Sequence, residues 1–462
     1  MRVPRTSIGG GRGARSLAGP ACGSTRLRLP AGVDGRGRST GMAVSGRVRA
    51  RGAAVTALAL AVALAALSAV ASGEPRFRPD GPDAEAFGRS QGYPPCQGLD
   101  YVREQRCRIG AFSQFDTLYP ARTVKASGAP VPLARAPSEP PVVYALEGQR
   151  LTLDQYLERH PVTGLLIAQG DTILAERYQY GRNDTQRLTS FSMAKTIVGL
   201  LIGVALEEGA IRSVDDPAEA YVPGLTGTEY GRTPIRALLQ MASGVAFREV
   251  YTDMQSDIAT LALATLGQAP GGSLAVLPRF NTRQAPPGQR FSYSSAESTV
   301  LGLVLAGATR RTVSDHASAK LWQPLGAEAD ATWCIDASGQ EITFAYYNAV
   351  LRDWARLGLM LAADGAWAGR RIVPRAWLRE ATTSTPQSPS PGYGYHVWLH
   401  PSAGRSFSLR GLRGQVVLVD PDRRRVLVQT AARAGMDRVA DQELFALWLA
   451  LRAQQGGARP SP

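Results

Sequence analysis

Residues 190–209 read SFSMAKTIVGLLIGVALEEG, and Lys195 in this stretch is the most informative residue of the chain. It lies three residues after Ser192, in a sequence with 49 arginines and only three lysines. In a chain so biased toward arginine, a lysine at this position suggests a role that arginine cannot perform. That role is the loss of a proton, because guanidinium does not deprotonate in proteins. An ammonium group, with a reference pKa of about 10.4, becomes a usable base when burial and nearby positive charge lower its pKa.

Apolar residues recur at helical spacing after Lys195 and stop at Gly209, so we expect a helix with Ser190 and Ser192 as candidate caps. In the first helical turn, a Ser-x-x-Lys pair places the hydroxyl and the amine on one face, where the amine can take the hydroxyl proton. The helix N-terminus stabilises an oxyanion, and the Ser192 amide can form half of an oxyanion hole. The same spacing is also common on solvated helix faces.

The surrounding pattern predicts an α+β fold. Residues 162–168 and 172–178 resemble a hairpin, and helical segments broken by turns run from about Asp215 to Gly326. The elements expected after this region are a helix over 352–362, strands at 394–399, 416–419 and 426–429, and an amphipathic helix over 438–452 with Val439, Leu444, Leu447 and Leu451 on one side. Strands at both ends with helices between them predict one antiparallel sheet beside a helical lobe.

The positive charge is concentrated in the N-terminal region. The net charge is +14, but residues 1–52 carry eleven arginines against the single acid Asp34. The body lacks a basic patch interleaved with aromatic residues, which argues against a nucleic-acid partner. An apolar run over 53–67 follows three arginines and precedes small residues, which predicts a secretory leader over 1–71, cleaved after Ala71, and a periplasmic or secreted protein. The alternative is an uncleaved membrane anchor.

Residues 72–141 are rich in Pro, Gly and Arg, which predicts an irregular N-terminal arm before a main domain over 142–455. Cys96 and Cys107 in this arm are expected to form a disulfide after export, with two free thiols as the alternative. No histidine lies near them, which disfavours a metal site. The four histidines of the chain lack metal-ligand spacing, so we interpret them as surface or strand residues and expect neither metal nor cofactor.

Several motifs occur in a characteristic order after Ser192-x-x-Lys195. They are LLQMASG at 238–244, PGQRFSYSS at 287–295, LWQPLG at 321–326, NAVLRDWARLG at 348–358 and GLRGQ at 411–415. In this order the chain resembles the serine hydrolases related to class C β-lactamases over roughly residues 150–450, particularly the branch with 6-aminohexanoate-dimer hydrolase and related esterases. The resemblance implies a β-lactamase/transpeptidase-like fold, an antiparallel sheet flanked by helices with an inserted helical lobe.

The resemblance also implies roles for three residues. Ser192 would be acylated, Lys195 would activate it, and Tyr293 would exchange protons with the leaving group. A phenol with a reference pKa of about 10, held near an ammonium, can share a proton with it and serve as acid or base in turn. The alternative for Tyr293 is a core aromatic that caps a helix.

Three further positions are candidate substrate contacts. Ser295 stands where many relatives have an asparagine, and it could also simply cap the next helix. The family's sheet-edge Lys-Thr-Gly is absent, and Arg410 is the best substitute, although it could be a solvated edge charge. Tyr251 lies in a loop that covers the substrate in the oligoamide-hydrolase branch.

These observations predict an exported serine hydrolase that cleaves an ester or amide bond of a small molecule through an acyl-enzyme. A β-lactamase or a penicillin-binding D-Ala-D-Ala peptidase, which would take a peptide-like substrate, is the second reading because it shares the acylating residues. The third is an inactive binding or regulatory protein with the same fold. A membrane partner is expected only if the leader stays uncleaved, and no pattern specifies an oligomeric state.

Overall fold

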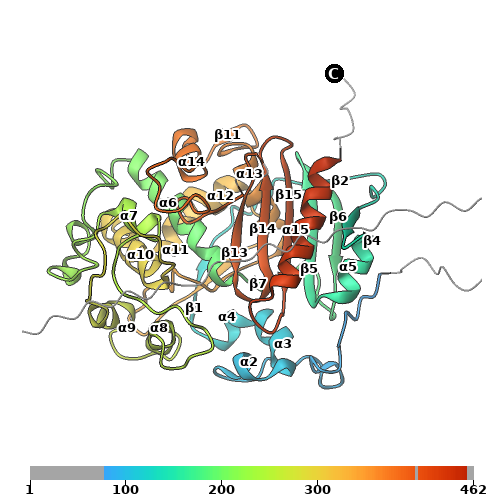
Figure 1. Cartoon of the computed structure of the whole chain (residues 1–462), viewed down its shortest axis with the longest axis horizontal. Helices are drawn as coiled ribbons and strands as arrows, with labels where there is room; N and C mark the ends of the chain where they lie inside the picture. The colour runs from blue at the N-terminus through green and yellow to red at the C-terminus, as the bar shows by residue number, and fades with distance from the viewer. Residues whose placement is uncertain (1–76, 401–403, 455–462) are drawn as a thin grey trace, which may run out of the picture. The chain divides into compact units, whose positions relative to one another are not determined.

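A seven-stranded sheet organises the part of the chain that the computed structural model describes, residues 77–400 and 404–454 (Figure 1). Its strand order is β12-β13-β14-β15-β5-β6-β2, and every pair is antiparallel except β2 with β6. The strands are β2 (Ala134–Arg135), β5 (Val162–Gln169), β6 (Thr172–Tyr178), β12 (Trp398–Leu399), β13 (Phe407–Gly411), β14 (Gln415–Asp420) and β15 (Arg425–Ala431). The expected leader and its cleavage position lie outside the described residues.

The hairpin expected from the sequence is present as β5 and β6, and it joins β15 from the far end of the chain. Alternate side chains of β5 enter different cores, as the two-residue repeat of a strand requires. Leu165 and Ile167 belong to one hydrophobic cluster, and Leu166 and Ala168 belong to the other. Both faces of the sheet are therefore buried.

Helices cover both faces of this sheet. On one face α13 (Leu351–Ala362) packs against β5, β14 and β15. On the other lie α5 (Leu153–Arg159) and α15 (Arg438–Ala453), with β3 (Val143–Leu146) and β4 (Gln149–Thr152) beside them. Leu444, Leu447 and Leu451 of α15 are buried as expected, but Val439 is 69% exposed, because it lies in the first turn beyond the packed stripe.

The helical lobe lies to one side of the sheet, at the left of Figure 1. Its helices are α7 (Ile235–Leu239), α8 (Asp257–Thr265), α9 (Gly272–Val276), α10 (Ser295–Thr309), α11 (Val313–Ala317) and α12 (Gln323–Leu325). A second sheet, β1-β8-β9-β7, consists of β1 (Ala121–Val124), β7 (Leu188–Thr189), β8 (Ala331–Cys334) and β9 (Tyr347–Ala349). β10 (Ala366–Trp367), β11 (Arg370–Arg371) and α14 (Arg375–Ala381) lie between α13 and β12 in the chain.

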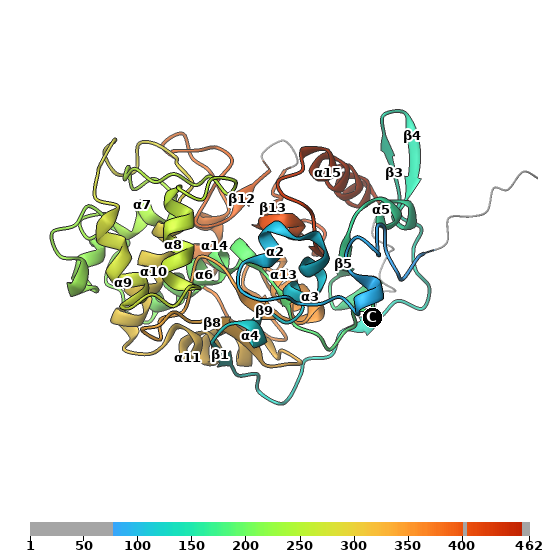
Figure 2. The same ribbon diagram turned by 90° about the horizontal axis from the view of Figure 1, so that it is seen from below.

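The N-terminal arm is more regular than its composition predicts. It contains α2 (Asp100–Arg103), α3 (Arg108–Phe112) and α4 (Phe115–Leu118), and β1 and β2 pair with strands of the main domain. Figure 2 shows α2, α3 and α4 on the side of the molecule that faces the viewer. Helices of four or five residues are too short to produce a detectable helical repeat, which explains why the sequence indicated an irregular segment.

The strand expected over 394–399 is also shorter than predicted. Only Trp398 and Leu399 pair, with β13, because the Gly394 amide donates to the Val397 carbonyl at 2.9 Å and closes a turn. None of the helices in the described part of the chain combines the length and the hydrophobicity that a membrane span requires.

Candidate active site

The expected nucleophile lies at the junction of a short 3-10 turn, Phe191–Met193, and the long helix α6 (Ala194–Glu207). Neither Ser190 nor Ser192 caps this helix through its side chain, contrary to expectation. The Ser190 hydroxyl instead donates to the Phe191 carbonyl at 2.8 Å and accepts from the Tyr347 amide at 3.1 Å. Phe191 has a φ of 43°, a strained backbone conformation of the kind that persists where surrounding structure enforces it.

Strand β13 passes directly beside this turn. Gly411 ends the strand, and a Cβ built there would lie 2.1 Å from the Ser190 carbonyl oxygen. Only glycine permits this approach without displacing the backbone. The close contact brings the end of β13 next to Ser192.

Lys195 is buried, with 1% of its surface exposed, and its amine faces Ser192. Nζ lies 2.9 Å from Ser192 Oγ, 3.2 Å from Ser295 Oγ and 2.7 Å from the Phe344 carbonyl oxygen. Burial lowers the pKa of Lys195 to about 7, because the charged amine loses its hydration, while the negative charge of Glu249 acts in the opposite direction. A substantial fraction of the amine is therefore neutral near neutral pH.

The hydrogen bonds around Nζ determine where its lone pair points. A neutral amine has two N–H donors and one lone pair. The Phe344 carbonyl can only accept, and Ser295 must also accept from Nζ because its hydroxyl donates to the Glu249 carboxylate at 2.6 Å. Both N–H groups are then used, so the remaining lone pair faces the Ser192 hydroxyl. This is the geometry of a general base beside its nucleophile.

Glu249 is a site residue that the sequence analysis missed. Its carboxylate accepts from the Ser295 amide at 2.9 Å, the Ser295 hydroxyl and the Tyr251 hydroxyl at 2.6 Å. Ser295 thus links Glu249 to Lys195, and Tyr251 contacts the same carboxylate while 38% of its surface stays exposed. A single acid in a polar loop has no distinguishing signal, and only its position two residues before Tyr251 could have drawn attention to it.

Tyr293 lies on another side of the same amine. The Lys195 amine is 5.2 Å from its ring centroid. The ring stacks on Trp398 at 5.6 Å and meets Tyr393 edge-on at 6.2 Å. Burial, with the charge of Glu249, raises the pKa of Tyr293, and a hydrogen bond with Ser192 opposes this in part. The Tyr293 phenol therefore stays protonated at pH values at which the Lys195 amine is neutral.

The histidines differ from expectation, because His316 and His396 are buried. His396 Nδ1 lies 3.0 Å from the Lys195 carbonyl oxygen, and the Thr196 hydroxyl donates to the His396 carbonyl at 2.7 Å. Burial lowers the pKa of His396 to about 3, so the ring is neutral and Nδ1–H donates to the helix. His396 therefore supports the first turn of α6 from behind.

Arg410 does not line the cavity that contains Ser192. Its guanidinium lies 3.9 Å from the Asp441 carboxylate of α15 and lines a separate pocket with Asp437 and Arg433. Arg413, three residues later, lines the cavity that contains Ser192. The role of Arg410 as the substitute for the missing lysine stays a prediction, and the structure shows that Arg413, beyond the end of β13 at Gly411, is the arginine that lines the cavity with Ser192.

The comparisons with known proteins agree with this geometry. Residues 150–451 match the family profile described as Beta-lactamase. The chain belongs to the β-lactamase family. It is 27% identical to a 6-aminohexanoate-dimer hydrolase of Paenarthrobacter ureafaciens over 349 residues, which cover 72% of this chain and 88% of that protein. The expected resemblance and the assignment as a serine hydrolase of this fold are confirmed.

Solved structures with a similar fold include two with TM-scores above 0.5. A protein of Bacillus anthracis assigned as a 6-aminohexanoate-dimer hydrolase superposes with a TM-score of 0.70 at 20% identity, covering 77% of this chain and 95% of that one. SurE, solved with D-Leu, gives 0.51 at 21% identity, covering 66% and 76%. The predicted fold class is confirmed. Within the described residues, no group of three or more His, Cys, Asp or Glu could hold a metal ion.

We predict that Glu249→Gln moves the pH dependence of Ser192 reactivity to lower pH. Glu249 raises the Lys195 pKa, so removing its charge lets that pKa fall further below 7 and the neutral amine persist in more acidic solution. The rate of covalent labelling by a fluorophosphonate probe, followed from pH 5 to 9, measures the shift. Asp253→Asn, in the same loop, is the matched control. An unchanged or raised midpoint in Glu249→Gln would contradict this account.

Proposed function

We propose that this protein is an exported serine hydrolase that cleaves an ester or amide bond of a small molecule through an acyl-enzyme at Ser192. The observation that carries the proposal is the position of the buried Lys195 amine, which lies 2.9 Å from Ser192 Oγ while Ser295 Oγ and the Phe344 carbonyl are placed to accept its N–H groups. The buried amine with its pKa of about 7 can accept a proton near neutral pH.

In the acylation step, Ser192 Oγ attacks the substrate carbonyl while its proton passes to Lys195 Nζ. The negative charge on the carbonyl oxygen is stabilised by the Ser192 backbone amide and by an amide from the chain that follows β13, which Gly411 brings beside the nucleophile.

Tyr293 supplies the proton for the leaving group. The environment moves the pKa values of the two groups apart, because it lowers that of Lys195 and raises that of Tyr293. This difference favours the amine as the base and the phenol as the acid. The proton taken by Lys195 returns to the phenol once the leaving group departs. A water molecule then attacks the acyl-enzyme and gives its proton to Lys195 Nζ, which passes a proton to Ser192 Oγ as the bond between Ser192 and the acyl group breaks and the acid product leaves.

The substrate class is supported by two observations. The similarity to 6-aminohexanoate-dimer hydrolase favours a linear amide or a related ester. The absence of a sheet-edge Lys-Thr-Gly disfavours a β-lactam or a cell-wall peptide, whose carboxylate that motif binds in the family.

We expect Ser192→Ala and Lys195→Arg each to lose more than 99% of turnover. Arginine preserves the charge but cannot act as a base, whereas Lys125→Arg, at an exposed ion pair with Asp330, should retain wild-type rates. One purified sample would be assayed against p-nitrophenyl esters, linear aminohexanoate oligomers and nitrocefin, with fluorophosphonate labelling in parallel. Preferential hydrolysis of nitrocefin would favour the β-lactamase reading. No labelling and no hydrolysis would indicate a binding protein.

Tyr293→Phe should discriminate between leaving groups. A p-nitrophenolate departs without protonation, so that ester should lose less than about tenfold in kcat, whereas an amide needs a proton and should lose about 10²–10⁴-fold, the usual contribution of general acid catalysis. Steady-state kinetics on an amide and an ester with the same acyl group measure the contrast. Equal losses on both substrates would exclude the role of proton donor.

Export is part of the proposal, and the Cys96–Cys107 disulfide supports it because such bonds persist in oxidising compartments. We expect mass spectrometry of the protein recovered from the periplasm or the medium to place the mature N-terminus at Ser72. A product that retains the residues before Ser72 would indicate an uncleaved anchor or an unexported protein.

A further inference from the structure

We propose that the disulfide-closed loop from Cys96 to Cys107 forms one wall of a pocket for the acyl part of the substrate, and that this wall selects apolar acyl groups. The inference rests on the proposed function, because it assumes that Ser192 is acylated. It adds the class of substrate and the segment of the chain that selects it.

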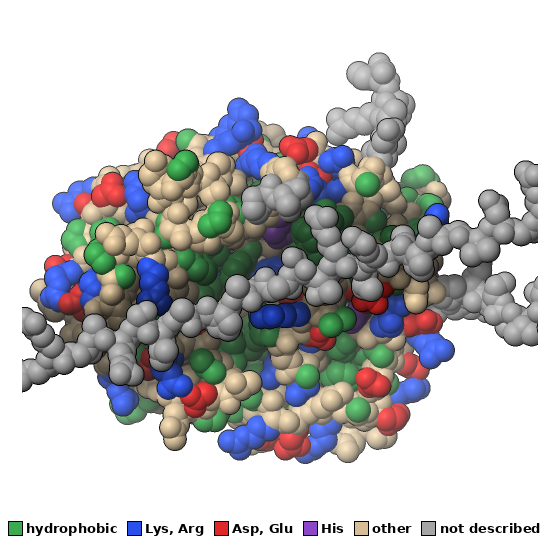
Figure 3. Space-filling model, in the orientation of Figure 1, with side chains coloured by type: hydrophobic (Ala, Val, Ile, Leu, Met, Phe, Trp, Pro, Cys, Tyr) green, Lys and Arg blue, Asp and Glu red, His purple; other side chains and the backbone are tan. Residues whose placement is uncertain are grey.

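The pocket opens at the nucleophile. Ser192 lines it together with apolar side chains that include Leu99 and Val102 of the arm, Met254 and Ile258 of the lobe, and Leu412 after β13. Figure 3 shows hydrophobic side chains gathered in a central hollow of the face drawn there, beside the helical lobe. Val250, Met254 and Leu263, which also line the pocket, are between 42 and 51% exposed. Exposed apolar side chains clustered around a cavity are typical of a binding site.

The charged group at the pocket is already engaged. Arg413 donates to the carbonyls of Arg433 at 3.1 Å and Val102 at 3.4 Å, and also to that of Ala434. Burial lowers the pKa of Arg413 to about 10. No carboxylate is among the described residues that line the pocket. The lining therefore favours an apolar group over a charged one.

The positions of the catalytic residues indicate which part of the substrate enters. Ser192 and Ser295 line the pocket, but Tyr293 does not. Because Tyr293 is the proposed proton donor to the leaving group, the leaving group lies on its side of the scissile bond. The acyl chain lies on the other side of that bond, so it is the part of the substrate that enters the pocket lined by Ser192.

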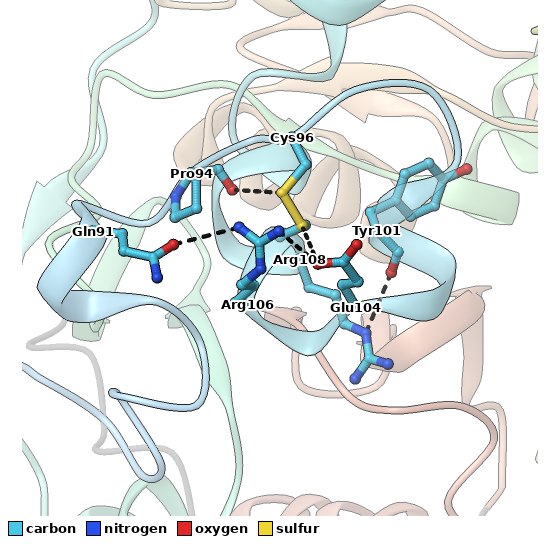
Figure 4. Close-up of a disulfide and its surroundings, with 8 residues drawn as sticks. Gln91, Pro94, Cys96, Tyr101, Glu104, Arg106 and Arg108 are labelled. Carbon is cyan, nitrogen blue, oxygen red and sulfur yellow. Dashed lines mark hydrogen bonds and ion pairs between the residues drawn. A yellow bond between two sulfur atoms is a disulfide. The ribbon is translucent and has the colours of Figure 1, made fainter.

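The arm loop is held in place from several directions. Cys96 and Cys107 form a disulfide with Cα atoms 5.4 Å apart, and the three pocket-lining residues of the loop, Leu99, Tyr101 and Val102, lie between them. Figure 4 shows this bond, with Arg108 Nε donating to the Tyr101 carbonyl at 3.3 Å. Arg413 holds the next carbonyl, that of Val102. Two guanidinium groups and a covalent bond thus fix the backbone that presents Leu99 and Val102.

Aromatic side chains pack the same loop against the 3-10 turn Phe191–Met193, which carries Ser192. The Tyr101 ring lies 5.5 Å from Phe115 and 6.5 Å from Phe191, the residue before Ser192. Phe112 meets Phe191 edge-on at 5.0 Å.

The arm precedes residue 150, where the match to the family profile begins. The pocket wall is therefore supplied by a segment outside the part of the chain that defines the family.

The size of the pocket limits the acyl chain. Its volume is about 120 Å³, comparable to the ~150 Å³ apolar cavity that binds benzene in an engineered protein. We therefore expect kcat/KM to rise by roughly fourfold for each methylene added to the acyl chain, as burial of apolar surface predicts, and to level off at about six carbons.

The test is a series of p-nitrophenyl esters from acetate to octanoate, which share one leaving group. Leu99→Trp and Val102→Phe fill the pocket from the arm and should lower kcat/KM for hexanoate at least tenfold, mainly through KM, while acetate changes less than twofold. Leu118→Trp, in the arm but outside the pocket lining, is the matched control and should keep the wild-type profile. Cys96→Ser/Cys107→Ser, which loosens the wall without filling the pocket, should raise KM for hexanoate more than for acetate.

An acyl-length profile identical in wild type, Leu99→Trp and Val102→Phe, with Ser192-dependent hydrolysis of acetate intact, would overturn this inference and leave the proposed function standing. Equal losses on acetate and hexanoate would also overturn it, since they indicate damage to the catalytic residues. If the wild-type protein neither hydrolyses any ester nor is labelled at Ser192, the proposed function fails and this inference fails with it.

Discussion

The site depends on one constraint, the burial of a single amine whose hydrogen bonds leave its lone pair facing a hydroxyl. Removing Lys195 from water is unfavourable for its charged form, so the fold stabilises the neutral amine that a base requires. The Phe344 carbonyl and Ser295 then occupy its two N–H groups. A charged lysine exposed on a helix face, the alternative allowed by the sequence, would have neither property.

Segments far apart in the chain meet to create this environment. Ser192 comes from the 3-10 turn before α6, Lys195 from the first turn of α6, Ser295 from α10, and Glu249 from the loop before α8. Gly411 lets β13 approach the nucleophile turn, and the aromatic rings of the arm pack behind it. The site is therefore a property of the assembled sheet, lobe and arm, and none of these segments would form it alone.

Much of the framework could be predicted from the sequence, because strands and helices of sufficient length have clear repeats. The β5–β6 hairpin, α6, α13, β14, β15 and α15 follow from such repeats. Glu249 could not be found, since its role comes from contacts with Ser295 that no spacing reveals. The sequence also could not show that Arg413, and not Arg410, lines the cavity, because this depends on where β13 ends, and the short helices of the arm leave no periodic pattern.

The protonation of Lys195 is the most direct test of the account, and the chain suits it because it contains only three lysines. In protein labelled with ¹³C at lysine Cε, each lysine should give one resolved signal, and the Lys195 signal is the one absent from Lys195→Arg. The account predicts that this signal titrates with a midpoint near 7. A Lys195 signal that stays in its charged position up to pH 9 would contradict it.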